Sequence, residues 1–383
     1  MTESSSAENN KNCPNDLILT IDNGTQSVRA LLFDLRGNLV AKSRVELEAY
    51  FSIKPGWAEQ HSDYFWQMLG KCCQQLWQQK DVIENDYRAR VTAVTLTTQR
   101  GTVINLDKNG HALRPAIIWL DQRLCKKNEA MPWYWRVGFF LIGQHKVVNY
   151  FRRKSQANWL AEYEPEIWQK TDKFLLLSGF LTYKLTGQFK DSVGSIAGYF
   201  PLNYKKQTWA SAWRWQWKAL PVKRSMLPSL VKPGEKLGEL TAEAAAHMGL
   251  KVATRVIASA SDKACEVLGS GCISPDTASL SYGTTATINT NNVKYIEPNS
   301  FIPPYPSAIP EQYNSEVMIY RGFWMVNWFK QEFGQNEVEQ AQVLGVSTES
   351  LFDQLVAQVP PGSMGLMLQP YWSPGLKNLE AKG

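Results

Sequence analysis

The sequence predicts a folded protein of mixed α/β class with two domains, and three observations support this prediction. The chain has 383 residues, whereas single domains commonly hold about 100 to 200 residues. Hydrophobic residues make up 44% of the chain and charged residues 20%, which is typical of globular proteins and not of disordered ones. A unit of strand, Gly-Thr turn and strand occurs twice, around Gly24 and around Gly283. We therefore expect two related halves with a cleft between them.

Charge and composition exclude several classes of partner. The chain has 41 basic and 35 acidic residues, a net charge of +6, which is mild for its length, so nucleic acid is not the expected partner. The most apolar stretch, 131–150, is interrupted by Arg136, His145 and Lys146 and is therefore not a membrane span. Residues 1–15 are polar and lack the apolar core of a secretory signal. We expect a disordered leader over 1–15, a cytoplasmic location and no membrane partner.

Strands and helices alternate along the first half of the chain. Two apolar runs separated by a turn at residues 22–25 predict a strand pair, and alternating residues after a turn at Gly37 extend it to an antiparallel meander. Apolar residues recur at helical spacing from Phe65 to Leu76. The expected elements are strands over 17–21, 28–33, 39–48, 91–97 and 102–106, and a helix capped by Ser62 or Asp63.

Further along the first domain, the sequence predicts a helix beginning at Thr171 and ending at Gly187, a residue suited to a left-handed C-cap. The Trp-rich stretch 209–217 is either a stacking platform for a sugar or base or a packing surface, and packing is favoured. A connector and a short Ala-rich helix precede a strand over 252–259. We therefore divide the chain into a domain over 16–255 and a domain over 256–383. The second strand pair is expected over 277–281 and 286–290.

Each Gly-Thr turn places backbone N–H groups where they can converge on an anion, and Thr25 and Thr284 add hydroxyl donors. Each turn taken alone is better explained as an ordinary hairpin turn. The presence of one such turn in each domain favours a polyphosphate held between them. Asp22 ends the first strand, where its carboxylate could hold Mg²⁺ or form an Asx turn.

Asp262 follows an apolar strand and begins a helix of small residues. Its carboxylate could cap that helix. It could equally act as a general base that deprotonates a hydroxyl for attack on a γ-phosphate. Spacing alone does not decide between the two roles.

Eight short stretches, in order and spread from about residue 16 to the end of the chain, resemble the motifs of the FGGY-family carbohydrate kinases. They are DNGTQSVR (22–29), PGWAEQ (55–60), QRGT (99–102), PAIIWLDQR (115–123), EPEIW (164–168), LTG (185–187), SDKA (261–264) and YGTT (282–285). The resemblance implies the two-domain actin-like, ribonuclease-H-like ATPase fold. It also implies transfer of a phosphoryl group from ATP, with Mg²⁺, to a small-molecule sugar.

The resemblance further implies roles for the matching residues. Asp262 would be the catalytic base and would contact the sugar, and Asp22 would support Mg²⁺. The residues implied to hold the nucleotide phosphates are Gly24, Thr25, Gln26, Gly283, Thr284 and Thr285. Those implied to border the sugar pocket are Gln99, Arg100, Trp119 and Asp121. A homodimer is also plausible by resemblance.

The chain departs from the family pattern at Gly101. Glycerol kinases of the family have Gln-Arg-Glu-Thr where this chain has Gln-Arg-Gly-Thr, and xylulokinases have a His in that place. Loss of the carboxylate opens space and removes two acceptors, which favours a substrate larger than glycerol. We therefore expect a ketopentose or related sugar as the substrate, with a glycerol or polyol kinase as the alternative.

Family members usually continue for another hundred or more residues, with a Gly-rich adenosine site that this chain lacks. The second domain is therefore expected to be incomplete, and the chain alone to bind ATP weakly and show little kinase activity. A catalytically impaired nucleotide- or sugar-binding protein is the main alternative, although the presence of Asp262 argues against decay. An actin- or chaperone-like ATPase would not need the stretches around Trp57 and Trp119.

Overall fold

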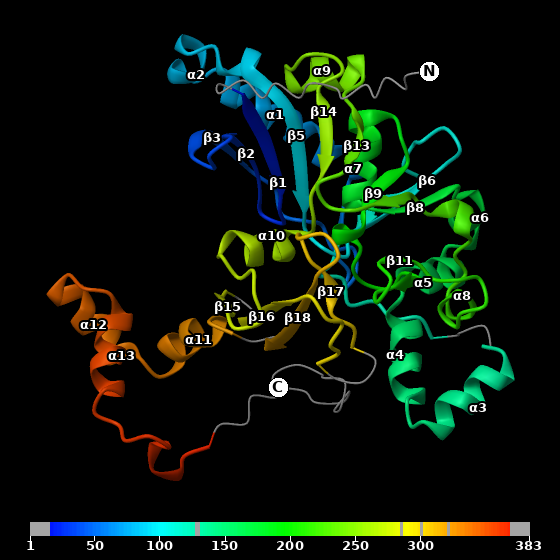
Figure 1. The fold of residues 1–383 in the computed structure, drawn as a ribbon. Coiled ribbons are helices and arrows are strands. Elements are labelled where there is room, and N and C mark those ends of the chain that lie inside the picture. The colour runs from blue at the N-terminus through cyan, green and yellow to red at the C-terminus, as the bar shows by residue number, and fades with distance from the viewer. Residues whose placement is uncertain (1–15, 127–130, 284–285, 299–301, 320–321, 368–383) are drawn as a thin grey trace, which may run out of the picture.

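The computed structural model describes residues 16–126, 131–283, 286–298, 302–319 and 322–367. Its main feature is a six-stranded sheet of order β13-β14-β5-β1-β2-β3 (Figure 1). The strands are β1 (Leu17–Asn23), β2 (Ser27–Asp34), β3 (Leu39–Glu46), β5 (Val91–Thr98), β13 (Lys236–Glu239) and β14 (Arg255–Ala258). β1, β2 and β3 pair antiparallel, which confirms the predicted meander. β1, β5 and β14 are parallel neighbours, and β13 is antiparallel at the edge.

Helices pack on this sheet and on one another. They are α1 (Ser62–Trp77), α2 (Lys80–Glu84), α7 (Leu177–Thr186) and α9 (Ala242–Met248). α1 contacts β2 and β3, α7 contacts β5 and β13, and α9 joins the two helices. Alternate residues of β1 are fully buried beneath them, and Cys72 and Cys73 of α1 belong to the same core. The helix is thus confirmed and begins at Ser62, but the predicted cap was wrong, because His61 and not Ser62 or Asp63 occupies the N-cap.

A second core lies beside a four-stranded sheet of order β4-β7-β6-β8. Its strands are β4 (Glu59–Gln60), β6 (Val103–Leu106), β7 (Ala116–Ile117) and β8 (Lys173–Leu176). There are also two sheets of two strands each. One contains β9 (Lys190–Ser192) and β12 (Ser229–Val231), and the other contains β10 (Leu202–Asn203) and β11 (Thr208–Trp209). The nearby helices are α3 (Trp133–Leu141), α4 (His145–Lys154), α5 (Gln156–Tyr163), α6 (Pro165–Lys170) and α8 (Gln216–Ala219).

The helix predicted from Thr171 was wrong at its start. Residues 173–176 form β8 instead, paired antiparallel with β6, and α7 begins at Leu177. Three consecutive apolar residues, Phe174 to Leu176, are all buried, and such a short run fits a buried strand as well as a helix. The predicted end was correct, because Gly187 caps α7 with φ of 70°. The Trp-rich stretch is mainly a packing surface, since Trp209, Trp215 and Trp217 contact the second core.

The last part of the chain contains an antiparallel sheet of order β15-β16-β18-β17 followed by three helices (Figure 1). Its elements are β15 (Ser279–Tyr282), β16 (Ala286–Asn292), β17 (Tyr305–Pro306), β18 (Tyr313–Ile319), α11 (Trp324–Glu332), α12 (Gln335–Leu344) and α13 (Thr348–Val356). Met364 lies in a short 3₁₀ turn. Across the described residues, no helix has the length and apolarity needed to cross a membrane.

Candidate active site

Three of the predicted site residues lie at the same edge of the six-stranded sheet. Asp22 is the second-last residue of β1, Gln99 follows β5, and Asp262 follows β14 as the first residue of α10 (Asp262–Gly269). Because β1, β5 and β14 are parallel neighbours, their carboxyl ends meet at one edge. This edge is where open α/β sheets bind their ligands.

Hydrogen bonds between the strand ends fix this edge. The Gln99 backbone N–H donates to the carbonyl of Asn23 at 3.1 Å, which extends the pairing of β1 with β5. The hydroxyl of Thr97 donates to the carbonyl of Ala260 at 2.8 Å, so the loop before Asp262 is tied to β5. The backbone therefore holds Asp262 in place independently of its own side chain.

The surroundings of Asp262 strengthen its hold on a proton. Burial raises the pKa of Asp262 above the ordinary value of an aspartate, the positive charges of Arg100 and Lys263 oppose that rise, and the negative charge of Asp22 adds to it. One carboxylate oxygen accepts the backbone N–H of Lys263 at 2.7 Å. The N-cap of α10 is Ser261 and not Asp262, so the capping interpretation does not account for this residue. A raised pKa makes a carboxylate a better proton acceptor.

Asp22 is a partly buried carboxyl with one charged partner. Burial raises the pKa of Asp22, and an ion pair with Arg29 at 3.1 Å opposes that rise. Arg29 is half exposed and can swing toward solvent. Mg²⁺ usually takes one or two protein carboxylates and completes its shell with water and substrate phosphates. A single carboxylate at this position therefore fits Mg²⁺, even though the described residues contain no cluster of three or more metal-ligating side chains.

The hydroxyl of Thr25 links two residues predicted for the sugar pocket. It donates to Oε1 of Gln99 at 2.8 Å and accepts from Nε1 of Trp119 at 2.8 Å. A hydroxyl has only one donor hydrogen, so in this conformation Thr25 has no side-chain donor left for a phosphate. The other two residues of the turn are placed differently: Gly24 closes it through its N–H to the carbonyl of Ser27, and Gln26 is exposed.

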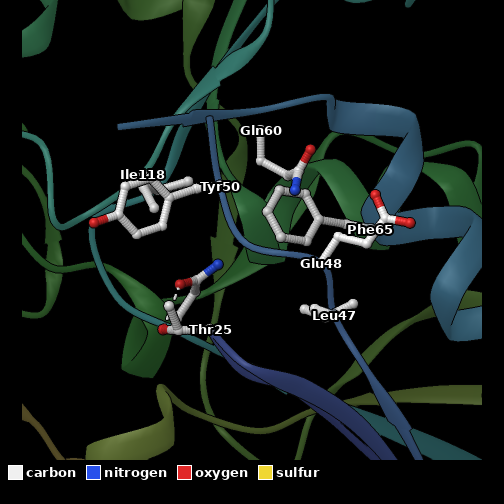
Figure 2. A pocket seen from close by; sticks show the side chains of 8 residues that line it. Thr25, Leu47, Glu48, Tyr50, Gln60, Phe65 and Ile118 are labelled. Carbon is white, nitrogen blue, oxygen red and sulfur yellow. Dashed lines mark hydrogen bonds between the residues drawn. The ribbon is translucent and has the colours of Figure 1, made fainter. Parts of the chain in front are cut away.

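A small cavity lies beside Thr25 and Gln99 (Figure 2). Its volume is about 10 Å³, which is room for about one water molecule. Apolar side chains and oxygen acceptors both face it, and the lining residues are Thr25, Leu47, Glu48, Tyr50, Gln60, Phe65, Gln99 and Ile118. A sugar at this place would therefore need the pocket to widen.

Arg100 does not face this cavity as a free cation. Its guanidinium pairs with both carboxylate oxygens of Glu316 on β18, at 2.9 and 3.2 Å, and lies 5.0 Å from the ring centroid of Tyr305. Sequence analysis missed Glu316. The available signal was a single carboxylate followed by the three apolar residues 317–319 in a strand-like run.

Asp121 joins two of the motifs in a buried network. It accepts the backbone N–H of Ala58 at 2.7 Å and pairs with Arg123, whose guanidinium also pairs with Glu59 at 2.7 Å. Arg123 lies 4.0 Å from the ring centroid of Trp57. The stretches 55–60 and 119–123 are thus held together by ion pairs and ring contacts. Every acceptor site of Asp121 is used here, so it orients the loop that carries Trp119.

The second Gly-Thr turn is described only in part. Gly283 accepts the N–H of Phe323 through its carbonyl at 2.9 Å. Lys263 contacts the hydroxyl of Ser281 at 3.3 Å, which places the start of α10 next to β15 and hence near this turn. Thr284 and Thr285 lie outside the described residues.

Known proteins resemble this chain in sequence and in fold. Residues 17–269 match the model of the FGGY family of carbohydrate kinases, N-terminal domain. The chain is 27% identical to an uncharacterized sugar kinase of Escherichia coli over 93% of this chain and 64% of that protein. It is 27% identical to a xylulose kinase of Lactococcus lactis over 92% of this chain and 67% of that protein. The chain thus spans about two thirds of the length of these curated relatives.

Solved structures show the same fold. A xylulose kinase from Lactobacillus acidophilus superposes with a TM-score of 0.74 at 20% identity, covering 94% of this chain and 69% of that one. A xylulose kinase from Rhodospirillum rubrum gives 0.74 at 23% identity, covering 93% and 70%. These values establish the mixed α/β, actin-like ATPase fold predicted from the sequence. Together with the match over 17–269, they show that the chain belongs to the FGGY family of carbohydrate kinases.

Proposed function

We propose that this protein phosphorylates a sugar hydroxyl with ATP, and that the sugar is a ketopentose or a related compound. The observation that carries the proposal is the position of Asp262. This partly buried carboxyl has a raised pKa and shares a sheet edge with Asp22 and Gln99. Family membership and relatives named xylulose kinase support the same reaction.

In the proposed reaction, Asp262 accepts the proton of the sugar hydroxyl. The hydroxyl oxygen then forms a bond to the γ-phosphorus as the bond to the β–γ bridging oxygen breaks, and ADP leaves. Such transfers depend mainly on positioning and on stabilisation of charge. Asp22 would hold Mg²⁺, which supplies neutralising charge at the phosphates. The positive charge of Arg100, close enough to lower the pKa of Asp262, keeps part of the base ionised.

The remaining assignments are proposals of the same kind. The turn residues Gly24 and Gln26, with Gly283, Thr284 and Thr285 of the second turn, would lie against the nucleotide phosphates. Gln99 and Trp119 would contact the sugar, with Thr25 fixing their orientation through its hydroxyl. We also propose the division into domains at residues 255 and 256, a cytoplasmic location and a homodimer.

A panel of sugars and polyols tests the proposal by two measurements on the same protein. Binding is measured by calorimetric titration with xylulose, ribulose, gluconate and glycerol, and turnover is measured as sugar-stimulated release of ADP. We expect a ketopentose to bind most tightly and to stimulate the weak ADP release of this chain more than the other compounds do. Asp262→Asn should lower turnover by about 10² to 10⁴ while sugar binding changes by only a few-fold.

The matched control is Asp353→Asn, which makes the same change at an exposed aspartate on α13 and should alter neither measurement. Binding of no member of the panel would contradict the sugar assignment. If Asp262→Asn keeps more than half of the turnover of the unmodified protein, Asp262 is not the base.

A further inference from the structure

Helix α3 exposes apolar side chains to solvent along one face. Trp133 is 74% exposed and Leu141 is 77% exposed, and Phe140 lies beside them with most of its ring uncovered. The other face also carries apolar side chains, because Trp135 stacks on the buried Phe139 at 5.7 Å. A helix that is apolar on both faces is normally buried on both. The outer face of α3 therefore lacks a partner among the described residues.

The two stretches of chain around α3 are basic and contain no acidic residue, although Glu162 lies beside Arg152 and Lys218, and Glu311 pairs with Lys232. Residues 131–161, which contain α3 and α4, hold five Lys or Arg residues and no Asp or Glu. Residues 192–234 hold seven and again no Asp or Glu. The two stretches pack together, since the rings of Phe139 and Phe151 both contact Trp215, at 5.4 and 5.3 Å. This defines the α3 surface, which is formed by residues 131–161 and 192–234.

The charge of this surface differs from that of the rest of the chain. The α3 surface holds 12 of the 41 basic residues of the chain and none of its 35 acidic residues. The rest of the chain therefore has 29 basic and 35 acidic residues. The chain outside the α3 surface therefore carries a net charge of −6. The helix dipole accounts for basic residues in the last turn of α4, but it does not account for the absence of acidic residues from 192–234.

Aromatic and basic side chains also alternate at the neighbouring edge of the surface. Trp213 is 67% exposed, and the guanidinium of Arg214 lies 4.9 Å from its ring centroid. Arg136 on α3 and Lys146 in the first turn of α4 are both exposed. In Figure 1, α3 and α4 project from the lower right of the molecule, away from the six-stranded sheet, so a large flat surface can approach them.

We propose that the α3 surface binds an anionic lipid bilayer, with the outer face of α3 inserted among the lipid head groups. Short amphipathic segments with Trp, Phe and Leu on one side and Lys or Arg nearby bind in this way, through buried apolar area together with attraction to acidic lipids. The net negative charge of the rest of the chain would orient the protein so that only this surface meets the bilayer. The sequence predicted no membrane partner because no stretch can span a bilayer, and binding at the interface needs no span.

Charge and chemistry favour a bilayer over two other occupants. A second copy of the chain would bring like-charged surfaces together in a two-fold contact. Nucleic acid would match the charge, but the aliphatic side chains of Leu141 and Ile142 offer it neither hydrogen bonds nor a stacking plane. The proposal is independent of the sugar kinase reaction, and its test does not require activity.

Co-sedimentation with vesicles tests the proposal on the intact chain. We expect binding to equimolar phosphatidylglycerol and phosphatidylcholine vesicles, no binding to pure phosphatidylcholine, and loss of binding at high salt. The double variant Phe140→Ser, Leu141→Ser should lower the partition coefficient about tenfold or more. Arg136→Gln and Lys146→Gln should each lower it about fivefold. Val343→Ser with Leu344→Ser, an equally exposed apolar pair on α12, is the matched control and should leave it unchanged.

Three results would overturn the proposal. The first is absence of binding to the anionic vesicles, or binding that the α3 variants leave intact. The second is a dimer of the unmodified chain in sedimentation equilibrium that the Phe140→Ser, Leu141→Ser variant dissociates, which would assign the surface to a second copy. The third is binding of single-stranded RNA with two properties: the same variants weaken it, and the RNA displaces vesicles from the protein at a concentration lower than that of the lipid.

Discussion

Arg100 and Glu316 form a bidentate ion pair, with N–O distances of 2.9 and 3.2 Å, between the loop after β5 and the strand β18. The pair joins the candidate active-site edge of the main sheet to the last sheet of the chain. Burial alone would lower the pKa of Arg100, but the facing carboxylate of Glu316 raises it above its ordinary value. Arg100 therefore stays charged beside Asp262, and Glu316 offsets part of the field that Asp262 experiences.

Changing the ion pair should move the pKa of Asp262. In Glu316→Gln, the charge of Arg100 is no longer offset, so its stabilising effect on the ionised form of Asp262 grows and the pKa of Asp262 falls. In Arg100→Gln the effect reverses and the pKa rises. Carbon-13 NMR of aspartate carboxyl groups over a pH titration measures both shifts, with Asp262→Asn to identify the signal. The acidic limb of turnover should move in the same directions, because a general base acts only when ionised.

The control for that titration is Glu311→Gln. It removes a carboxylate from an exposed ion pair with Lys232 and should not move the Asp262 signal. Equal shifts in the two glutamate variants would show a change in overall charge and not an effect of the ion pair. An unchanged signal in Glu316→Gln would contradict the proposed coupling.

The hydroxyl of Thr25 should matter for sugar binding more than for nucleotide binding. Thr25→Val keeps the shape of the side chain but leaves Oε1 of Gln99 and Nε1 of Trp119 without their shared partner. Loss of a partner for such groups costs about 1 to 3 kcal/mol, so we expect sugar affinity to fall about tenfold. Thr25→Ser retains the hydroxyl and is the matched control. Calorimetric titrations with xylulose and with Mg-ADP separate the two effects. A loss of affinity for Mg-ADP alone would support the contact between Thr25 and the phosphates that the family resemblance implies.

The sequence predicted the parts of the fold that depend on local patterns. The meander from Leu17 to Glu46 and the helix α1 follow from alternation and helical spacing. The strand β8 was missed because three successive apolar residues carry no period that separates a strand from a helix. Only its pairing with β6, which lies about 70 residues earlier in the chain, decides the outcome.

The site was predicted as a set of residues but not as a network. Parallel strand ends explain why Asp22, Gln99 and Asp262 come together, and their motifs lie at strand ends in the sequence. The partner of Arg100 lies 216 residues away, and no pattern of local spacing reports such a contact. The assignment of Thr25 to the phosphates likewise took no account of Trp119, which is 94 residues away.

A buried aspartate outside the site should make stability depend on pH. Burial raises the pKa of Asp191 to about 7, against hydrogen bonds from Ser178 and Ser192 that lower it. The folded state then binds a proton that the unfolded state has already released between about pH 4 and 7, so the free energy of unfolding should fall as pH rises through this window. A shift of about three units corresponds to a loss of up to about 4 kcal/mol.

Asp191→Asn removes the ionisable group and should flatten this dependence. Denaturant unfolding at several pH values measures the slope, and Asp353→Asn at an exposed position is the control. We expect the variant to be less stable than the unmodified protein at pH 5, where neutral Asp191 donates and accepts hydrogen bonds, and to lose less stability on going to pH 8. Parallel curves for the two proteins would show that Asp191 does not titrate in this range.

The last prediction concerns the glycine that replaces the family's carboxylate or imidazole. Gly101 has φ of 75°, and a Cβ there would meet only Cβ of Trp119 at 3.6 Å, so space is available but any side chain would strain the backbone by about 1 to 2 kcal/mol. Gly101→Glu would therefore combine backbone strain with a new carboxylate, and Gly101→Ala carries the strain alone. We expect the ratio of glycerol to xylulose affinity to rise about tenfold or more in the Glu variant relative to the Ala variant, because buried hydrogen-bonding groups discriminate between substrates more strongly than apolar volume does. Calorimetric titration of both variants with both compounds gives the ratio. An equal change in the two variants would assign the effect to the backbone, and a preference of the unmodified protein for glycerol would contradict the argument from the missing carboxylate.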